Sequence, residues 1–493
     1  MKLKTITILL LCFLVSITVL ACAKKYEGGE SSPTPAPSAD ASDNTKDKDT
    51  AEEEVYPENG LPKNEKVTLK MGFFEAGMGR EYIDYALDTF KQKFPNVSFE
   101  VTYSPTVQTV VNTKISAGND EDMFDMFNSS LPGGTPAITA LVENGKLVDQ
   151  EDLWDHKLYD GNGKTVRELM MEGTFETAGR ILGKTYALPN TGTGAGLFYD
   201  KKLFEEHGWN QNPKTWSEFM ELLETIKQAG IIPITYTGVH VTYINNAFGT
   251  WKLFELAENS GNLEKFEDDF RNYKLPQYLA PEYVDLWNRL YEMGKKGYFP
   301  EGVAALDHTQ SQMQVLQHKA AMVSTGSWVE NEMKDSTPEG FEWGYMVVPM
   351  GEDPAATKWT RLTSGNGFYI WEGKPELNKK WAKEFNVWML NLDVQEVLGE
   401  KAGAIPLRKD FADDPARADK LQTLTKSILE YNKNNNTRGE SGYRNVTLTD
   451  PAFAQASKVM NEAITAITSG KQDPQPILEE AEKLLEKAIQ AQK

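Results

Sequence analysis

A glycine-rich stretch before residue 200 constrains the fold of this chain most strongly. It runs from Tyr186-Ala-Leu-Pro189 through Asn190-Thr-Gly-Thr-Gly-Ala-Gly196 to Leu197-Phe-Tyr-Asp200. Pro189 and the three glycines interrupt any regular element that precedes them, and the apolar run 197–199 is typical of a strand. The sequence therefore predicts a crossing between two structural units at this point.

A helical run directly after this stretch begins the second unit. Residues 201–208 favour a helix, and Pro213-Lys-Thr-Trp-Ser-Glu-Phe219 follows them. Thr215 stands three residues before Glu218, which predicts a capping box at the start of another helix. Apolar side chains then recur at helical spacing until Gly230, where we expect that helix to end.

Length and composition exclude some classes of protein. At 493 residues the chain exceeds the usual size of a single core, so we expect at least two domains. The net charge of −20 argues against nucleic acid as a partner, because phosphate binding needs clustered cations. The two cysteines, Cys12 and Cys22, both lie near the N-terminus, so the folded domains contain no disulfide and no cysteine nucleophile.

The N-terminal residues have the pattern of an export signal. Lys2 and Lys4 precede an apolar run at 6–20, which is too short for a comfortable membrane span. The run ends Val19-Leu-Ala-Cys22, which resembles a bacterial lipobox. This predicts a signal peptide at 1–21, Cys22 as the lipidated residue, carrying palmitate, and a disordered tether at 22–60. An ordinary signal peptide or an uncleaved anchor are the alternatives.

The first unit begins with a strand, a helix and a strand. Alternation at 67–71, a helical face at 83–94 and alternation at 97–103 predict a βαβ unit and a parallel sheet. Ligands bind beyond the carboxyl ends of such strands, so the loop 75–80 is a candidate site on topology alone. A second helix near 107–115 and a short strand at 124–127 repeat the pattern.

The rest of the chain shows further elements of both kinds. We expect helices at 136–142, 281–293 and 381–390, a hairpin at 179–188, and an aromatic-rich loop at 236–251. Strands are expected at 231–234, 320–323, 341–348 and 363–370, and a helical tail includes Ile464, Ile467 and Leu485.

Several motifs suggest catalysis or metal binding, but none has the residue spacing that such a site requires. The run 178–185 is close to a phosphate-binding loop, but Pro189 excludes the helix that such a loop must open. The run 160–163 suggests a calcium loop, but Lys164 occupies a ligand position. The five histidines show no metal-ligand spacing, and no nucleophile elbow is present. We therefore expect no catalytic residue, no metal and no cofactor, although a glycosidase carboxylate pair is a tertiary feature that sequence does not exclude.

Two blocks carry a resemblance to a known family. The crossing motif Tyr-x-x-Pro with Tyr199-Asp-Lys-x-Leu-Phe204 and Pro213-Lys-Thr-Trp-x-Glu-Phe219 resembles that of the extracellular solute-binding proteins of ABC importers, family 1. Gln317-His-Lys-Ala-Ala-Met322 with Gly326-Ser-Trp328 is similar to a second block of the sugar-binding branch. The resemblance covers residue 67 to the C-terminus.

The resemblance implies an α/β, two-lobed, periplasmic-binding-protein-like fold of type II. Its sheets are expected to be mostly parallel and flanked by helices. Residues 61–190 plus 349–391 would form lobe 1, and residues 191–348 plus 392–493 lobe 2. The crossing segments would lie near 190–196 and 349–365, and again near 391–400.

The resemblance also implies a set of ligand-binding residues. Sugar sites combine flat aromatic rings with a few fixed polar groups. Trp328 and Tyr243 are the expected stacking residues, and Tyr443 and Arg444 lie where the family has its last cleft loop. The polar candidates on strand-end loops or at the crossing are Glu75, Asn128, Ser129, Thr191 and Thr193. Arg80 and Arg361 would indicate an anionic sugar if they point into the cleft, and surface ion pairs if they do not.

The function implied is binding rather than catalysis. The resemblance implies a monomeric, lipid-anchored lipoprotein on the extracellular face of the cell membrane of a Gram-positive type bacterium. It would bind carbohydrate, an oligosaccharide, and deliver it to the ABC permease subunits. Two alternatives stay open: the same fold binding a peptide, polyamine or anion, and a surface polysaccharide-degrading enzyme.

Overall fold

The computed structural model describes residues 54–131, 135–171, 174–361, 363–365 and 367–492. The chain divides into two units, residues 1–52 and 53–493, and the description below concerns the second. The predicted signal peptide, the lipidation of Cys22 and most of the predicted tether lie outside the described residues. Within the described ranges, no helix is both long and apolar enough to cross a membrane.

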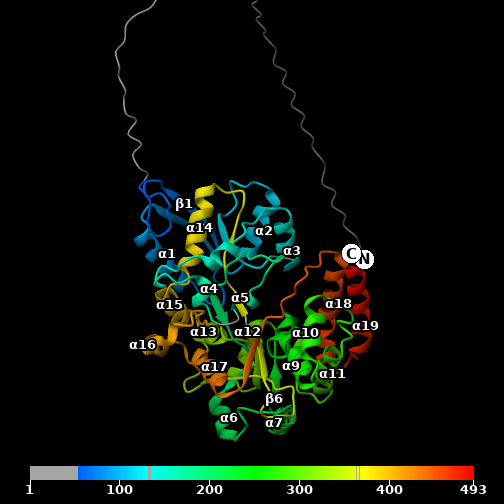
Figure 1. The fold of residues 1–493 in the computed structure, drawn as a ribbon. Coiled ribbons are helices and arrows are strands. Elements are labelled where there is room, and N and C mark those ends of the chain that lie inside the picture. Colours follow the sequence, from blue (N-terminus) through cyan, green and yellow to red (C-terminus); the bar gives the residue numbers. More distant parts are fainter. Residues whose placement is uncertain (1–53, 132–134, 172–173, 362, 366, 493) are drawn as a thin grey trace, which may run out of the picture. The chain divides into compact units, whose positions relative to one another are not determined.

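The first sheet has the strand order β11-β3-β1-β2. β1 (Val67–Phe74) pairs in parallel with β2 (Val97–Ser104) and with β3 (Met126–Asn128), whereas β11 (Tyr369–Ile370) is antiparallel to β3. α1 (Glu81–Lys93) connects β1 to β2. The βαβ unit predicted from hydrophobic periodicity is therefore confirmed (Figure 1).

Helices cover this sheet and close its core. Phe90 of α1 packs against Trp381 and Phe385 of α14 (Glu376–Trp388), with ring centroids 6.1 and 5.3 Å apart. The other elements of this lobe are α2 (Val107–Ala117), α3 (Thr135–Glu143), η1 (Glu151–Asp155), α4 (Val166–Leu169) and α5 (Thr174–Thr177). The expected hairpin at 179–188 is a tight turn, in which Ile181 and Lys184 exchange backbone hydrogen bonds.

The third expected crossing, near 391–400, is a helix of the first lobe instead. α15 (Leu392–Ala402) places Val394 and Leu398 in the same hydrophobic cluster as Phe90 and Trp381. Its apolar face packs on α1, so the first-lobe core continues past residue 391. The expected strand 363–370 also differs, because it is divided into β10 (Thr363–Gly365) and β11.

The prediction of a disordered tether through residue 60 is wrong for residues 54–60. Tyr56 is buried, and its ring stands edge-on to Phe94 and Trp381 at centroid distances of 4.9 and 5.8 Å. The Tyr56 hydroxyl donates to Asn96 Oδ1 at 2.8 Å. The Tyr56 ring packs this segment on the first lobe, and a hydrogen bond from Tyr56 N to the Leu61 carbonyl and an ion pair between Glu58 and Lys93 add to the attachment.

The crossing is built from closely packed backbone. β4 (Thr191–Thr193) is antiparallel to β10. A Cβ on Gly192 would lie 2.9 Å from the Ile405 carbonyl oxygen, and one on Gly194 would lie 2.7 Å from the Ile428 side chain. These glycines therefore permit close approach at the crossing, rather than only interrupting regular structure as the sequence analysis expected.

The second sheet has the order β6-β7-β5-β8 and is mixed rather than mostly parallel. β6 (Ile232–Thr235) is parallel to β7 (Ala320–Gly326), but β5 (Ala195–Asp200) is antiparallel to both β7 and β8 (Trp343–Met346). β5 enters the lobe from the crossing, and β8 runs back toward it, so the two have opposite directions. A further pair, β9 (Lys358–Arg361) and β12 (Thr437–Glu440), is parallel.

Helices form most of the second lobe, and a large hydrophobic cluster joins them to the sheet. α7 (Trp216–Gln228) begins at Thr215, whose side chain accepts from Glu218 N at 3.1 Å, while Glu218 itself accepts from Lys214 N. This is a variant of the predicted capping box. The remaining elements of this lobe are α6 (Lys201–His207), η2 (Val241–Ile244), α8 (Asn245–Phe248), α9 (Trp251–Asn259), α10 (Leu263–Arg271), α11 (Pro281–Lys295), η3 (Val303–Ala305), α12 (His308–Leu316), α13 (Val329–Met333), α17 (Thr423–Asn434), α18 (Pro451–Thr468) and α19 (Gln475–Ala491). η4 (Phe411–Asp413) and α16 (Pro415–Asp419) instead pack on α15 of the first lobe.

A buried ion pair fixes the chain where it leaves the second sheet. Lys252 Nζ lies 2.8 Å from Glu255 Oε2, and both side chains are almost fully enclosed. Glu255 also accepts from the backbone N–H groups of Met350 and Trp359 at 2.7 and 3.0 Å. These bonds hold both ends of the segment 350–359 against α9, next to the strand that carries Arg361.

Candidate functional site

A cavity of about 490 Å³ is lined by residues of both lobes and of the crossing between them. This volume is within the usual range for small-molecule sites. The first lobe contributes residues 76–78 of the loop 75–80 and Tyr82, the second contributes Tyr243 and Trp328, and the crossing contributes Thr191 and Thr193. Five of the eleven predicted binding residues line it: Asn128, Thr191, Thr193, Tyr243 and Trp328.

Trp328 and Tyr243 form the aromatic part of this cavity. Trp328 directly precedes α13, at the end of the loop that follows β7. Its ring lies against Gly326, because a Cβ on Gly326 would come within 2.1 Å of the indole. The Tyr243 ring is 6.4 Å from that of Trp328 and at 82° to it. Burial, with a smaller contribution from Glu332, raises the pKa of Tyr243 to about 12, so its hydroxyl stays protonated at neutral pH.

A carboxylate with fixed orientation lies beside these rings. Glu332 Oε2 is 2.7 Å from His308 Nε2 and accepts from Gln312 Nε2 at 2.9 Å. His308 is itself 4.9 Å from the Tyr243 ring, centroid to centroid. Both Glu332 and His308 line the cavity. The arrangement presents a hydrogen-bond acceptor next to two aromatic faces, which suits the hydroxyl groups of a sugar ring.

The first-lobe wall combines strand-end backbone with one amide side chain. Asn128 ends β3, and its Oδ1 accepts from Phe74 N at 2.9 Å. Its Nδ2 group has no hydrogen-bond partner among the residues described here, so it is available as a donor to a ligand. Gly77 and Met78 of the loop 75–80 also line the cavity, which places the topological candidate loop at the site.

The two lobes touch at the rim of this cavity. Asn331 Nδ2 of α13 donates to the carbonyl of Gly77 at 2.7 Å. Glu332 approaches the same glycine, since a Cβ on Gly77 would meet its carboxylate at 3.4 Å. The helix that follows Trp328 therefore contacts the loop that follows β1.

Four of the predicted residues lie outside the lining of this cavity. Arg80 is exposed; its Nε donates to Asp84 at 2.8 Å and its guanidinium lies over the Tyr103 ring. Arg361 donates to Asn246 Oδ1 at 2.6 Å, and burial lowers its pKa. Glu75 is half-buried beside the lining residues. Ser129 has a buried hydroxyl without a partner in the described part of the chain.

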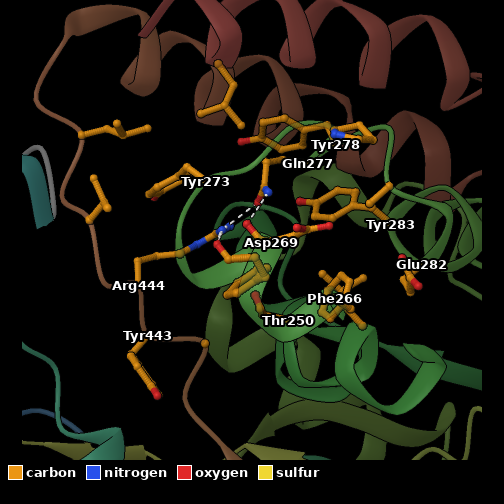
Figure 2. A pocket seen from close by; sticks show the side chains of 18 of the residues that line it. Thr250, Phe266, Asp269, Tyr273, Gln277, Tyr278, Glu282, Tyr283, Tyr443 and Arg444 are labelled. Carbon is orange, nitrogen blue, oxygen red and sulfur yellow. Dashed lines mark hydrogen bonds between the residues drawn. The ribbon is translucent and has the colours of Figure 1, made fainter. Parts of the chain in front are cut away.

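Tyr443 and Arg444 line a different cavity, of about 450 Å³, mostly within the second lobe. In Figure 2 the Arg444 side chain reaches toward Gln277, whereas Tyr443 points in another direction. Arg444 Nη1 donates to Gln277 Oε1 at 2.7 Å and to the Phe270 carbonyl. The last cleft loop of the family pattern thus lies against α10 in this chain, and not beside Trp328.

Several lining residues were missed by the sequence analysis. Glu332 was detectable in principle, because it stands four residues after Trp328 in a helical stretch and so shares its side of the helix. Tyr82 is the second residue of α1, just after the candidate loop. His308 gave no local signal, because its approach to Glu332 depends on tertiary packing. His240 lies three residues before Tyr243, so its nearness to that ring was detectable from the sequence once Tyr243 was a candidate.

The lining of the cavity carries few charged side chains. Among the described residues, no group of three or more His, Cys, Asp or Glu side chains forms a metal site. Of the residues that line the cavity in the described part of the chain, none is lysine or arginine, and Glu332 is the one acid.

Comparisons with known proteins agree with this architecture. The family model for a bacterial extracellular solute-binding protein matches residues 86–424. The diacetylchitobiose binding protein NgcE of Streptomyces coelicolor is 25% identical over 340 residues, which cover 68% of this chain and 67% of that protein. The sn-glycerol-3-phosphate-binding periplasmic protein UgpB of Brucella abortus is 25% identical over 317 residues, covering 63% of this chain and 68% of that protein.

The fold is also found among solved structures. A chitin oligosaccharide binding protein superposes with a TM-score of 0.63 at 18% identity, and the match covers 86% of this chain and 99% of that chain. The resemblance and the two-lobed α/β fold expected from the sequence are confirmed. The chain belongs to the bacterial extracellular solute-binding protein family, as a non-enzymatic solute-binding component of an ABC importer.

Proposed function

We propose that this protein binds a neutral oligosaccharide in the cavity between its lobes and delivers it to the permease of an ABC importer. The observation that carries the proposal is the pairing of Trp328 and Tyr243 with the fixed carboxylate of Glu332 and the amide of Asn128. Aromatic faces suit the apolar side of a sugar ring, and the polar groups suit its hydroxyls. The carbohydrate named for NgcE and for the chitin oligosaccharide binding protein supports the same class of ligand.

The charge of the cavity favours a neutral ligand over a phosphate ester. UgpB is named for a phosphorylated solute, and recognition of phosphate ordinarily uses arginine or lysine side chains. In the described part of this cavity the charged group is Glu332, which would repel phosphate. The amino groups of a peptide or polyamine would have Glu332 as their one carboxylate partner in this lining, since the other described lining residues are uncharged or histidine.

The proposal includes the position of the protein in the cell. Export followed by lipidation of Cys22 would tether a monomer to the extracellular face of the membrane, where the permease is located. We propose the division expected from the sequence, with lobe 1 at 61–190 and 349–391 and lobe 2 at 191–348 and 392–493, changed at two places. Residues 54–60 are added to lobe 1, and α15 with η4 and α16 is moved from lobe 2 to lobe 1, on which these elements pack.

A thermal-shift screen tests the proposal. Residues 54–493 would be melted with neutral oligosaccharides, uronate oligomers, monosaccharides, peptides and polyamines. A ligand at 100 times Kd adds about 2.7 kcal/mol, which raises Tm by a few degrees. We expect a shift with one class of neutral oligosaccharide that is lost in Trp328→Ala and largely kept in Trp328→Phe. A shift with a peptide or polyamine, and none with any sugar, would overturn the function while leaving the fold intact.

A further inference from the structure

The cavity around Arg444 lies apart from the proposed sugar site and shares none of its lining residues. One part of its wall is aromatic and includes Phe266, Tyr273, Tyr278 and Tyr283, which Figure 2 shows, together with Phe270. Thr139 and Arg180 of the first lobe complete its lining. At about 450 Å³ it is large enough for a small organic molecule.

Arg444 is held rigidly in this cavity by one edge of its guanidinium. Its Nη1 donates to the Phe270 carbonyl and, at 2.7 Å, to Gln277 Oε1. Gln277 is buried and fixed in turn, because its Nε2 donates to the carbonyls of Asp269 and Lys274. The guanidinium lies 3.3 Å from the Phe270 ring centroid and 4.2 Å from that of Tyr273. The guanidinium of Arg444 is therefore already oriented before a ligand binds.

The other edge of the guanidinium is unused. In the described part of the chain, no hydrogen bond joins Arg444 Nε or Nη2 to any residue, and neither is among the fully enclosed atoms. Nε and Nη2 form the parallel pair of donors that binds a carboxylate or phosphate bidentately. Burial lowers the pKa of Arg444 to about 10, so the side chain is still charged at neutral pH.

The charge of Arg444 is also uncompensated, unlike that of its neighbours. No ion pair involves Arg444 among the described residues, whereas Arg271 pairs with Glu267 and Glu440. The acidic residues that line the cavity bind groups other than Arg444. Asp269 pairs with Lys265, and Glu282 accepts from Asn262 Nδ2 at 3.3 Å. Arg180 pairs with Glu151 at 3.3 Å. Among the charged lining residues, Arg444 and Glu282 are therefore the two without an ion-pair partner in the described part of the chain, and the unpaired guanidinium of Arg444 favours an anion at its free edge.

We propose that this cavity is a second ligand site, which takes a small organic anion. Its carboxylate or phosphate group would lie on the Nε and Nη2 edge of Arg444, and its ring or hydrocarbon body against the aromatic wall. The site is independent of the proposed sugar site, and neither residue 443 nor residue 444 contributes to the cavity that holds Trp328.

Calorimetric titration with charged probes and their uncharged counterparts tests this site. Benzoate, glucuronate, glucose 6-phosphate and inorganic phosphate would be compared with benzyl alcohol and glucose. We expect at least one of the charged organic probes to bind about tenfold or more tightly than its uncharged counterpart, since a charge-assisted bidentate pair contributes on this scale. The carboxylate and phosphate arms identify which anionic group the site prefers. Tightest binding by inorganic phosphate would indicate an ion site only and overturn the proposal of an organic ligand.

Variants separate this site from the sugar site. Arg444→Gln should reduce anion binding about tenfold or more and leave oligosaccharide binding unchanged, whereas Trp328→Ala should do the reverse. Arg444→Lys keeps the charge but not the fork, so it should weaken anion binding measurably even if Arg444→Gln does not fold. Equal binding of charged and uncharged probes, or anion binding unaffected by both Arg444 variants, would overturn the proposal and leave the sugar-binding function untouched.

Discussion

The indole of Trp328 lies edge-on to the phenol ring of Tyr243, with 6.4 Å between the ring centroids. The absence of a side chain at Gly326 permits this arrangement, because a Cβ there would come within 2.1 Å of the indole. Gly326 does not have a positive φ, so its role is to provide space rather than an unusual backbone conformation. The position of the ring that we propose to bind sugar is thus set by its neighbour two residues earlier.

Gly326→Ala should therefore weaken ligand binding without unfolding the protein. The added methyl group would displace the indole, and we expect Kd for the oligosaccharide to rise about tenfold or more in calorimetric titrations. Gly179→Ala is the matched control, because a Cβ at Gly179 would meet nothing within 4 Å. Equal affinities of wild type and Gly326→Ala would show that the observed position of Trp328 is not needed for binding.

The contact between Asn331 and Gly77 predicts a second effect on affinity. Asn331→Ala removes a hydrogen bond of 2.7 Å between the two lobes. Such a bond contributes about 0.5–1.5 kcal/mol net, so Kd should rise roughly two- to tenfold if the bound state has the lobes in this arrangement. The thermal stability of the ligand-free protein should change little.

Asn144→Ala is the control for that experiment, because the exposed Asn144 amide donates to Ala140 within the same lobe. It should leave Kd unchanged. If Asn331→Ala also binds the ligand with wild-type affinity, the contact with Gly77 does not contribute to the bound state.

The elements with regular hydrophobic periodicity were the ones that could be predicted. β1, α1 and β2 follow directly from alternation and helical spacing, because each buries one face against the same core. The glycines of the crossing were also informative, since close backbone approach excludes any larger residue. Trp328 and Tyr243 were located through the family pattern, and Asn128 through its place at a strand end.

What could not be predicted depends on distant segments. Pairing of β12 with β9 joins residues about eighty positions apart and directs the following loop, with Arg444, onto α10. The contact of Glu332 with His308 bridges two helices that carry no shared motif. The sequence also did not show where the Arg80 side chain points. Its ion pair with Asp84 depends on α1, and its stacking on Tyr103 depends on the position of β2 beside that helix.

The packing of Tyr56 predicts that residues 54–60 stabilise the first lobe. Tyr56→Ala removes a buried ring and its hydrogen bond to Asn96, so the free energy of unfolding should fall by about 2–4 kcal/mol in denaturant titrations. A chain that begins at residue 61 should lose a similar amount. Val55→Ala is the control, since that side chain is exposed and should have little effect. Unchanged stability of both the shortened chain and Tyr56→Ala would contradict the docking of this segment.

The contact between His156 and Glu384 predicts a specific dependence of stability on pH. His156 Nε2 lies 3.2 Å from Glu384 Oε1, and His156 Nδ1 lies 2.8 Å from the Lys157 carbonyl. The hydrogen bond to Glu384 is the main cause that raises the pKa of His156, and the nearby Asp152 acts in the same direction. Because the folded-state pKa is above the unfolded value of about 6.5, the stabilisation is complete below that value and is lost as pH rises through the folded pKa.

His156→Gln should therefore lower Tm most at pH 5, and the difference from wild type should shrink toward pH 8. Melting both proteins across this range measures the effect, with His207→Gln as a control because His207 is exposed and stacks only on Trp209 among the described residues. The control should show no comparable trend. A difference between wild type and His156→Gln that grows as pH rises would mean that the neutral imidazole, and not its cation, is the form that the folded state favours.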